Sequence, residues 1–564
     1  MSYFLKTSKQ GKRTYLAIYE SFYSPEVKGT RHKCIQSLGS VEKLMENGLE
    51  DPIGFYRKEV AKMNNQRKEE AAMEEGAKKL ISDKSPERRL GYFPVARILN
   101  NLDVKEHFDL MQSTRSFTFS LYEAFSALVY SRIVEPCSKL RTFEEVIPSL
   151  YMDCSCSYDQ LLSTIEFIGS EYEKFTEILT EATSENYGLD TSSTYFDCTN
   201  FYFEIDRETD FQKRGPSKEN RTSSIVDLGL LLDSNMIPIG MRMYPGNESE
   251  KPVLKNIIGD LKKRNNIKGK TVRVCDKGLN CAQNIADARK NGDGYLFSKS
   301  VRQLPEAEKK WVLLDEGYTD VYDSDGSLRY RYKSCVDEYT YSYRNDRGER
   351  VVFKTREKRV VTYNPLLAKK KNQEITKMVN KARSMSCSEA RRHEYGDSAK
   401  YIKFTDGNGH KAKAELNEKA IEKDRRLAGY NMLITSEVKM ESDRIYETYH
   451  NLWRIEESFK VMKSQLDARP VFLQTEDRIK GHFFICYAAV LLVRLLQFKE
   501  HKGEFPTETI MKFMKDFRVV QISSNKYVNL TTKTPFIKAL SDFTGYPLMN
   551  YYFTERQIKM MHYR

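Results

Sequence analysis

The sequence lacks the residue patterns of disulfide-rich and zinc-binding proteins. Its 564 residues include ten cysteines but no C-x-x-C pair, and its eight histidines form neither H-E-x-x-H nor a Cys/His zinc spacing. Cys154 and Cys156 are the closest cysteines, and a C-x-C pair alone is a weak metal signal. These absences favour free thiols in a reducing cytoplasm over a disulfide scaffold.

Long hydrophobic runs are also missing. The N-terminal stretch "MSYFLKTSKQGKRTYLAIYESF" has neither the apolar core nor the small-residue cleavage site of a signal peptide. The most hydrophobic run, Phe483 to Leu496, is too short to span a bilayer and contains Arg494. We expect a buried helix there, no membrane partner and a cytoplasmic location.

The chain does have an excess of positive charge. Lys and Arg number 92 against 79 Asp and Glu, so the net charge is +13. This balance favours a polyanionic partner such as DNA, although ribosomal or membrane-surface partners would fit it equally well. The length, with 40% hydrophobic and 30% charged residues, predicts a globular protein of two to four structural units.

Three segments precede the first long run of strand-forming residues. Residues 1–45 alternate apolar and polar side chains and predict a small β element, and residues 46–88 are charged and predict a helical linker. Residues 89–190 carry apolar side chains at helical spacing and predict an all-helical domain.

From residue 191 the pattern predicts an α/β core. "STYFDCTNFYFEI", "SIVDLGLLLD" and "IPIGMRMY" indicate three consecutive strands, and Leu254 to Leu261 indicate a helix with Ser249 as its N-cap. A strand ending at Asp276, a helix from about Cys281 to Lys290 and the strand "GYLFSKS" follow. Because the later strands need helical crossovers, we expect a mixed sheet with helices against its faces, beginning in residues 191–299.

The core is predicted to be interrupted and then resumed. Residues 300–428 carry hairpin signals at Asp325-Gly326 and Asp406-Gly407 and are interpreted as a β-rich insertion. Residues 429–500 return to core composition with the strand "YNMLITS" and a long helix. Residues 501–564 are assigned to a C-terminal helical region.

Two aspartates stand out in the predicted core. Aspartate is depleted in strands, yet Asp197 interrupts an aromatic-rich strand where an unpaired carboxylate is costly. Asp276 ends a neighbouring strand, where aspartate is commonly a turn or cap residue. Together with a glutamate from a helix laid against the sheet, they would be suitable oxygen ligands for Mg²⁺ or Mn²⁺. Two such ions support phosphoryl transfer.

The helix containing "YHNLWRIEESFKVMK" offers two glutamates. It is predicted to have Ser442 or Asp443 as its N-cap and to end before Pro470. Glu456 lies at the edge of the apolar stripe, whereas Glu457 points about 100° away toward solvent. An ordinary i,i+4 pair of Glu456 with Lys460 is the alternative interpretation. The apolar stripe consists of Ile455, Phe459, Met462 and Leu466.

These motifs resemble those of insertion-sequence transposases of the DDE superfamily. The signature of that family is Tyr, two residues, Arg, three residues, Glu, six residues, Lys; Tyr449, Glu456 and Lys463 occupy matching places, and Leu452 stands in the arginine place. "YFDCTN" is similar to the segment of the first catalytic aspartate and "VCDKGLN" to that of the second, with Cys281 where the family has an aromatic. "GPSKENR", "YPGNESEK" and "LDARPVF" also look like segments of the family.

The resemblance implies an RNase H-like mixed-sheet core and DNA transposase activity. Asp197, Asp276 and Glu456 would bind two divalent ions, Mg²⁺ or Mn²⁺, while Tyr449, Lys460 and Lys463 would hold DNA phosphates. The implied partners are transposon ends, target DNA and a second copy of the chain in the synaptic complex, near a bacterial nucleoid. The helical domain would recognise the ends.

Several alternatives remain open in the sequence. The loop with Arg214, Lys218 and Arg221 is either a DNA contact or a solvated turn, and Trp453 either packs in the core or stacks on an unpaired base. An RNase H-like nuclease without strand transfer would share all three carboxylates. A transposase-derived DNA-binding regulator is the other alternative.

Overall fold

The computed structural model describes residues 2–24, 26, 28–77, 85–205, 207–215, 223–248, 259, 269–385, 392–407, 410–523 and 525–563. The chain divides into two compact units. The first comprises residues 1–88, 519–532 and 549–559, and the second comprises residues 89–518, 533–548 and 560–564.

The first unit contains two antiparallel sheets. One has three strands, β1 (Ser2–Gln10), β2 (Arg13–Ser24) and β3 (Gly29–Ser40), followed by α1 (Val41–Glu46) and α2 (Pro52–Ala77). The Asn64 side chain fixes α2 to β1 because it accepts a bond from the Tyr3 amide at 2.7 Å and donates to the Tyr3 carbonyl at 2.8 Å.

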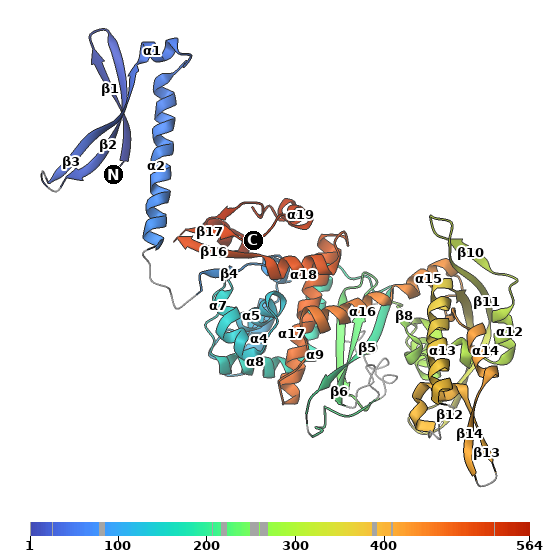
Figure 1. Ribbon diagram of the computed structural model, residues 1–564. Coiled ribbons are helices and arrows are strands. Elements are labelled where there is room, and N and C mark those ends of the chain that lie inside the picture. Colours follow the sequence, from blue (N-terminus) through green and yellow to red (C-terminus); the bar gives the residue numbers. More distant parts are fainter. Residues whose placement is uncertain are drawn as a thin grey trace. The chain divides into compact units, whose positions relative to one another are not determined.

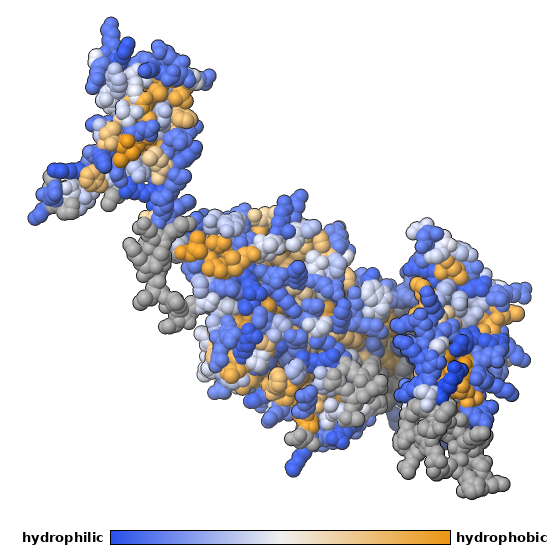
Figure 2. Space-filling view, viewed as in Figure 1, coloured by the Kyte–Doolittle hydropathy of each residue, from blue (hydrophilic) through white to orange (hydrophobic). Residues whose placement is uncertain are grey.

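The second sheet corrects the expectation that residues 501–564 are helical. Its order is β18–β17–β16–β4, formed by Tyr552–Phe553, Lys526–Asn529, Arg518–Ser523 and Glu87–Arg89. The alternating residues "RVVQIS" suit a strand with one buried face, so the local pattern favours a strand over a helix. Figure 2 shows hydrophobic residues on the surface over β16 and β17. The region's helices are α18 (Thr507–Asp516), α19 (Pro535–Thr544) and α20 (Glu555–Tyr563).

Helices of the second unit pack around α17 (Glu476–Arg494). α17 is long and apolar enough to cross a membrane on length and composition, yet 94% of its most apolar window is buried inside the protein. The prediction of a buried helix at Phe483 to Leu496 is therefore confirmed. The helices around it are α3 (Phe93–Asn101), α4 (Lys105–Ser113), α5 (Leu121–Val134), α8 (Tyr158–Ser170) and α9 (Tyr172–Tyr187), with the short α6 (Lys139–Arg141), η1 (Thr142–Val146) and α7 (Ile147–Ser149) between α5 and α8.

Two glycines bring α8 and α17 into backbone contact. A Cβ on Gly169 would lie 1.6 Å from the Asp477 carbonyl oxygen, and a Cβ on Gly481 would lie 1.9 Å from that of Ile165. Such distances are far below van der Waals contact, so only glycine permits this approach.

A nine-stranded mixed sheet organises the rest of the unit, in the order β10–β11–β12–β15–β9–β8–β5–β6–β7. Figure 1 labels its strands β5, β6, β8, β10, β11 and β12. β5, β8 and β9 run parallel, whereas β6 and β7 are antiparallel to their neighbours. In chain order these five strands are arranged 3-2-1-4-5, the arrangement of an RNase H-like core. Their bounds are β5 Ser193–Phe203, β6 Ser224–Leu232, β7 Pro238–Pro245, β8 Val272–Cys275 and β9 Gly294–Lys299.

The predicted strands and the crossover helix of this core are confirmed, since α11 (Ala282–Lys290) connects β8 to β9. The helix predicted over Leu254 to Leu261, with its cap Ser249, lies outside the described residues. On one face of β5, Phe196 and Cys198 pack with Ile285 of α11 in a buried cluster. The helix that carries the glutamates contacts β5, and the face of β5 opposite to this cluster is available for that contact.

The residues interpreted as an insertion extend this sheet directly. β15 (Tyr430–Thr435) pairs with β9 on one side and with β12 (Arg350–Tyr363) on the other, and β11 (Leu328–Arg344) and β10 (Thr319–Tyr322) follow. Pairing of β15 covers the edge of β9, whose backbone groups would otherwise lack partners. Between these strands lie η3 (Val301–Gln303), α12 (Glu306–Leu313), α13 (Pro365–Met385), η4 (Arg392–Tyr401), β13 (Ile402–Gly407), β14 (His410–Leu416) and α14 (Glu418–Arg426).

Candidate active site

Asp197 and Asp276 come from neighbouring parallel strands. Phe196 of β5 is in register with Cys275 of β8, so the next residue on each strand is one of the two aspartates. Residues in register on parallel strands are nearest neighbours across the sheet. Burial raises the pKa of the Cys275 thiol, and the charges of both Asp197 and Asp276 raise it further. Both carboxylates therefore lie close to one buried sulfur.

Tyr449 binds one of these aspartates. Its hydroxyl donates a 3.0 Å hydrogen bond to Oδ1 of Asp276. Burial raises the pKa of Tyr449 and the Asp276 charge raises it further, so the phenol stays protonated and remains a donor at neutral pH. The tyrosine of the signature thus orients a carboxylate, whereas the sequence suggested contact with a DNA phosphate.

The helix that carries Tyr449 and Glu456 is not continuous, which corrects the expectation of one straight helix. α15 (Ser442–His450) and α16 (Trp453–Lys460) are separated by Asn451 and Leu452. There the amides of Leu452, Arg454 and Ile455 bond to carbonyls three residues back, as in a 3₁₀ turn. Such a turn is tighter than an α-helical one, so it changes the direction of the side chains beyond it.

Different parts of the protein hold the two helices. Tyr446 of α15 stacks on Tyr330 of β11 with ring centroids 3.8 Å apart, and Ser442 bonds Ser334 of β11 at 3.1 Å. α16 contacts β5, and its Ser458 accepts a 3.2 Å bond from Arg494 of α17. The predicted apolar stripe is buried as expected, and its four residues are Ile455, Phe459, Met462 and Leu466. Leu452, in the place of the family arginine, is buried at the junction of the helices.

The two adjacent glutamates occupy different surroundings. Glu456 is exposed, and Glu457 is half-buried. Burial lowers the pKa of Arg494 to about 10, and the charge of Glu457 raises it. The charge of the half-buried Glu457 therefore favours the charged form of the buried Arg494 guanidinium.

One of the predicted DNA-binding cations, Lys463, contacts β5, the strand that carries Asp197. It belongs to η5 (Val461–Gln465), a π-helical turn, and its Nζ lies 5.3 Å from the ring centre of Phe201 on β5. Lys460 is exposed and forms a 2.9 Å ion pair with Glu508 of α18. Arg214 is exposed and lies 3.6 Å from Glu208. Lys218 and Arg221 lie outside the described residues.

Trp453 contradicts the core-packing interpretation, because its side chain is 51% exposed. It is the first residue of α16, and its neighbour Arg454 lies 5.9 Å from the ring centre.

The donor set suits a hard divalent cation in part. Asp197 and Asp276 supply adjacent carboxylate oxygens, the ligands that Mg²⁺ and Mn²⁺ prefer. Among the described residues no three acidic, histidine or cysteine side chains converge closely enough to hold a metal ion. The register therefore sets the two aspartates side by side, and no third acidic, histidine or cysteine side chain of the described residues completes a metal site with them.

One buried aspartate was missed in the sequence. Asp227 of β6 lies directly opposite Asn200 of β5 in the antiparallel register, and the Asn200 amide donates to its carboxylate. The signal that drew attention to Asp197, an aspartate inside an apolar strand, is equally present in "SIVDLGLLLD". Asn200 alternates with Asp197 along β5 and therefore lies on the opposite face, so Asp227 is not part of the aspartate pair.

An RNase H-like sheet with two aspartates in register on its central parallel strands defines a class of metal-dependent enzymes that act on polynucleotides. The family model of the transposase DDE domain matches residues 203–492, just over half of the chain. The chain belongs to this family and is a DDE transposase, an enzyme of metal-dependent DNA cleavage and transposition. Asp276 and Glu456 lie inside the matched range, and Asp197 lies just before it.

Two further comparisons add little to this assignment. No curated protein matches the sequence. The chain is similar to a piggyBac transposase in a synaptic complex with hairpin DNA, determined by cryo-electron microscopy, at 10% identity over 83% of each chain and a TM-score of 0.35.

Proposed function

We propose that the chain is the transposase of a bacterial insertion sequence, which binds the ends of its element, cleaves them and joins them to target DNA. The observation that carries this proposal is the register of β5 and β8, because it sets Asp197 beside Asp276 where phosphodiester chemistry requires clustered carboxylates. We further propose that two copies act together when both ends are cut. The enzyme would act in the cytoplasm, close to the nucleoid.

We propose Asp197, Asp276 and Glu456 as the ligands of two Mg²⁺ or Mn²⁺ ions. When bound, such ions activate a water or a 3′ hydroxyl and stabilise the leaving oxygen. Tyr449 holds Asp276 in one orientation through its hydrogen bond, and burial keeps its own proton in place. Lys463, half-buried next to β5, supplies a positive charge on the same side of that strand as Asp197.

The exposed residues of α16 are proposed to meet the DNA. Trp453 presents its ring to solvent and can stack on an unpaired base. Lys460 can exchange its carboxylate partner Glu508 for a phosphate, since an exposed ion pair contributes little to stability. We also propose a DNA contact by the loop between β5 and β6, through Arg214, Lys218 and Arg221.

The test is a joining assay with Mg²⁺ on DNA carrying the terminal inverted repeats that flank the gene. We expect the wild-type protein to nick both ends and to transfer them to a plasmid target, and a chelator to abolish both steps while DNA binding persists. Nicking without joined products would identify a nuclease that lacks strand transfer. Binding without either reaction would identify a regulator.

A further inference from the structure

A cavity of about 420 Å³ opens beyond the glutamate helix, outside the aspartate pair. Its lining includes Arg132 of α5, Lys139 of α6 and His482 of α17, together with Arg469, Asp467 and Phe472 from the segment that follows η5. The first three are almost completely buried, with 6%, 9% and 4% of their surfaces exposed. The cavity is therefore open to solvent on one side and has buried side chains of three helices in its wall.

The buried cations of this cavity have only neutral partners. Arg132 donates to the carbonyl oxygens of Cys137 at 3.1 Å and Leu466 at 3.5 Å, and Nζ of Lys139 lies 3.2 Å from Nδ1 of His482. Across the described ranges neither Arg132 nor Lys139 forms an ion pair. Burial lowers the pKa of Lys139 well below its ordinary value, and the charge of Arg132 lowers it further. Two neighbouring buried cations without a counter-ion are unfavourable.

The acidic residue of the lining does not balance them. Asp467 is exposed. Burial lowers the pKa of Lys515, and the charge of Asp467 raises it. Lys515 also donates a 2.8 Å bond to the carbonyl of Gln465. Asp467 is thus associated with a cation outside the cavity.

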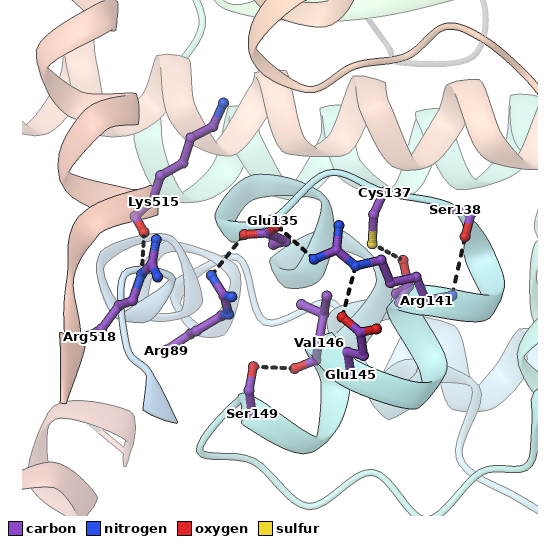
Figure 3. A network of polar contacts seen from close by, with 11 residues as sticks. Arg89, Glu135, Cys137, Ser138, Arg141, Glu145, Val146, Ser149, Lys515 and Arg518 are labelled. Atoms are coloured by element: carbon purple, nitrogen blue, oxygen red, sulfur yellow. Dashed lines mark hydrogen bonds and ion pairs between the residues drawn. The ribbon is translucent and has the colours of Figure 1, made fainter. Parts of the chain in front are cut away.

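A network of polar contacts holds the cavity wall in place (Figure 3). Arg141 bonds Glu145 at 2.8 Å and lies 3.4 Å from Glu135, which also binds Arg89 at 2.9 Å. Ser138 caps α6 by accepting a 3.2 Å bond from the Arg141 amide. Because these pairs surround residues 136–140, Lys139 is fixed at the cavity by interactions that do not include its own charge.

We propose that this cavity binds a backbone phosphate of the DNA substrate; the inference rests on the proposed transposase function. A phosphate supplies the negative charge that Arg132 and Lys139 lack, and it would favour protonation of His482 at Nδ1, which could then donate to it. Phe472, 77% exposed among the lining residues, favours an anion with a flat or apolar portion, such as a nucleotide, over a bare oxyanion.

Chain continuity connects the cavity with the aspartate strand. Lys463 lies over the ring of Phe201, on the face of β5 that carries Asp197, and Arg469 lies 5.0 Å from the ring centre of Tyr202, which the strand alternation places on the other face. A DNA strand at Asp197 would therefore pass Lys463 and the end of β5 before it reaches the cavity, where Arg469 is part of the lining and one of its phosphates would bind.

The test compares Lys139→Met and Arg132→Met with wild type, using a fluorescent 20-nucleotide oligothymidylate in chelator, so that cleavage does not contribute. Each substitution should weaken binding several-fold and lower the slope of log affinity against log salt by about 0.7, the value for one phosphate on a single strand. Lys538→Gln is the matched control, since it removes one exposed positive charge on α19 and does not line the cavity. Its salt slope should stay near that of wild type.

Thermal unfolding in phosphate-free buffer separates ligand binding from a structural role. Lys139→Met should raise the midpoint of the free protein, because an uncompensated buried charge is removed, and thymidine 5′-monophosphate should stabilise wild type more than the variant. A lowered midpoint with unchanged DNA affinity would overturn the inference. Stabilisation by the mononucleotide without any change in oligonucleotide binding would overturn it in favour of a free nucleotide. Wild-type protein that binds no DNA at all would instead refute the proposed function.

Discussion

The hydroxyl of Tyr449 donates a 3.0 Å hydrogen bond to Oδ1 of Asp276, across 173 residues of sequence. The bond joins the first helix of the transposase signature to the strand of the second aspartate. It assigns the signature tyrosine to the support of a proposed metal ligand. Its loss should therefore affect the metal requirement of the enzyme more than its affinity for DNA.

Tyr449→Phe is expected to reduce cleavage roughly tenfold to a hundredfold, because side chains that orient metal ligands typically contribute that much. The deficit should shrink as Mg²⁺ is raised, since the ring still fills its place while Asp276 is less well oriented. Cleavage rates titrated against Mg²⁺ provide the measurement. A deficit that is independent of metal concentration would contradict this role.

Asp197→Asn and Asp276→Asn are each expected to abolish detectable cleavage and strand transfer while DNA binding in chelator is retained. Each amide keeps the size of the side chain and removes one negative charge beside the other aspartate. Cleavage gels and anisotropy on the same preparations separate the two effects. Asp227→Asn is a useful control, since its partner Asn200 lies on the opposite face of β5; substantial cleavage should remain.

Glu456→Gln and Glu457→Gln distinguish the adjacent glutamates. Glu456→Gln should abolish cleavage with little change in stability, because that side chain is exposed. Glu457→Gln should cleave nearly normally but lose about 1 kcal/mol of unfolding free energy, since its charge favours the buried Arg494. The opposite pattern of activities would show that α16 presents Glu457 to the aspartates.

Asp293→Ala is expected to cost about 3–5 kcal/mol, measured by urea unfolding, because it leaves a buried arginine short of a counter-ion. Arg273 is fully buried on β8 and donates to Asp293 at 2.7 and 3.0 Å and to Asp287 at 2.7 Å. Glu508→Gln is the comparison, because its ion pair with Lys460 is exposed. The unfolding midpoint of that variant should not move, and its DNA affinity should rise as Lys460 is released.

His482 is expected to make the protein less stable at acidic pH. Burial lowers the pKa of His482 well below its ordinary value, and the charges of Lys139 and Arg132 lower it further; the Ala468 carbonyl, 3.0 Å from Nε2, opposes them. A histidine with a depressed folded pKa takes up its proton first in the unfolded chain. The contribution of neutral His482 to the free energy of unfolding is therefore complete above about pH 6.5 and is lost as the pH falls below that value.

His482→Gln should reduce this acid loss, measured as the change in urea midpoint between pH 7 and pH 5 in phosphate-free buffer. Parallel pH curves for the two proteins would show that His482 does not titrate on unfolding. Bound nucleotide should diminish the difference, because a phosphate favours the protonated imidazole.

Local sequence patterns determined most of the individual elements. Aromatic alternation located β5, apolar spacing located α11 and α17, and an aspartate inside an apolar strand pointed to Asp197. These signals depend on residues that are close to each other in the chain, so they can be recognised from the sequence alone. The same kind of signal is present at Asp227. The pattern of one strand does not predict its neighbour across the sheet, so the pairing of Asp227 with Asn200 was not predicted.

The partners of these elements depended on the tertiary structure. The register that sets Asp197 beside Asp276 and the extension of the sheet by β15, β12, β11 and β10 both join residues far apart in the chain. The tight turn at Asn451 and Leu452 lies between α15, which packs on β11, and α16, which contacts β5 and α17. Helical periodicity in the sequence does not predict these contacts with distant elements. Sequence periodicity thus determined which residues face a core, whereas packing between distant elements decided which charges meet inside it.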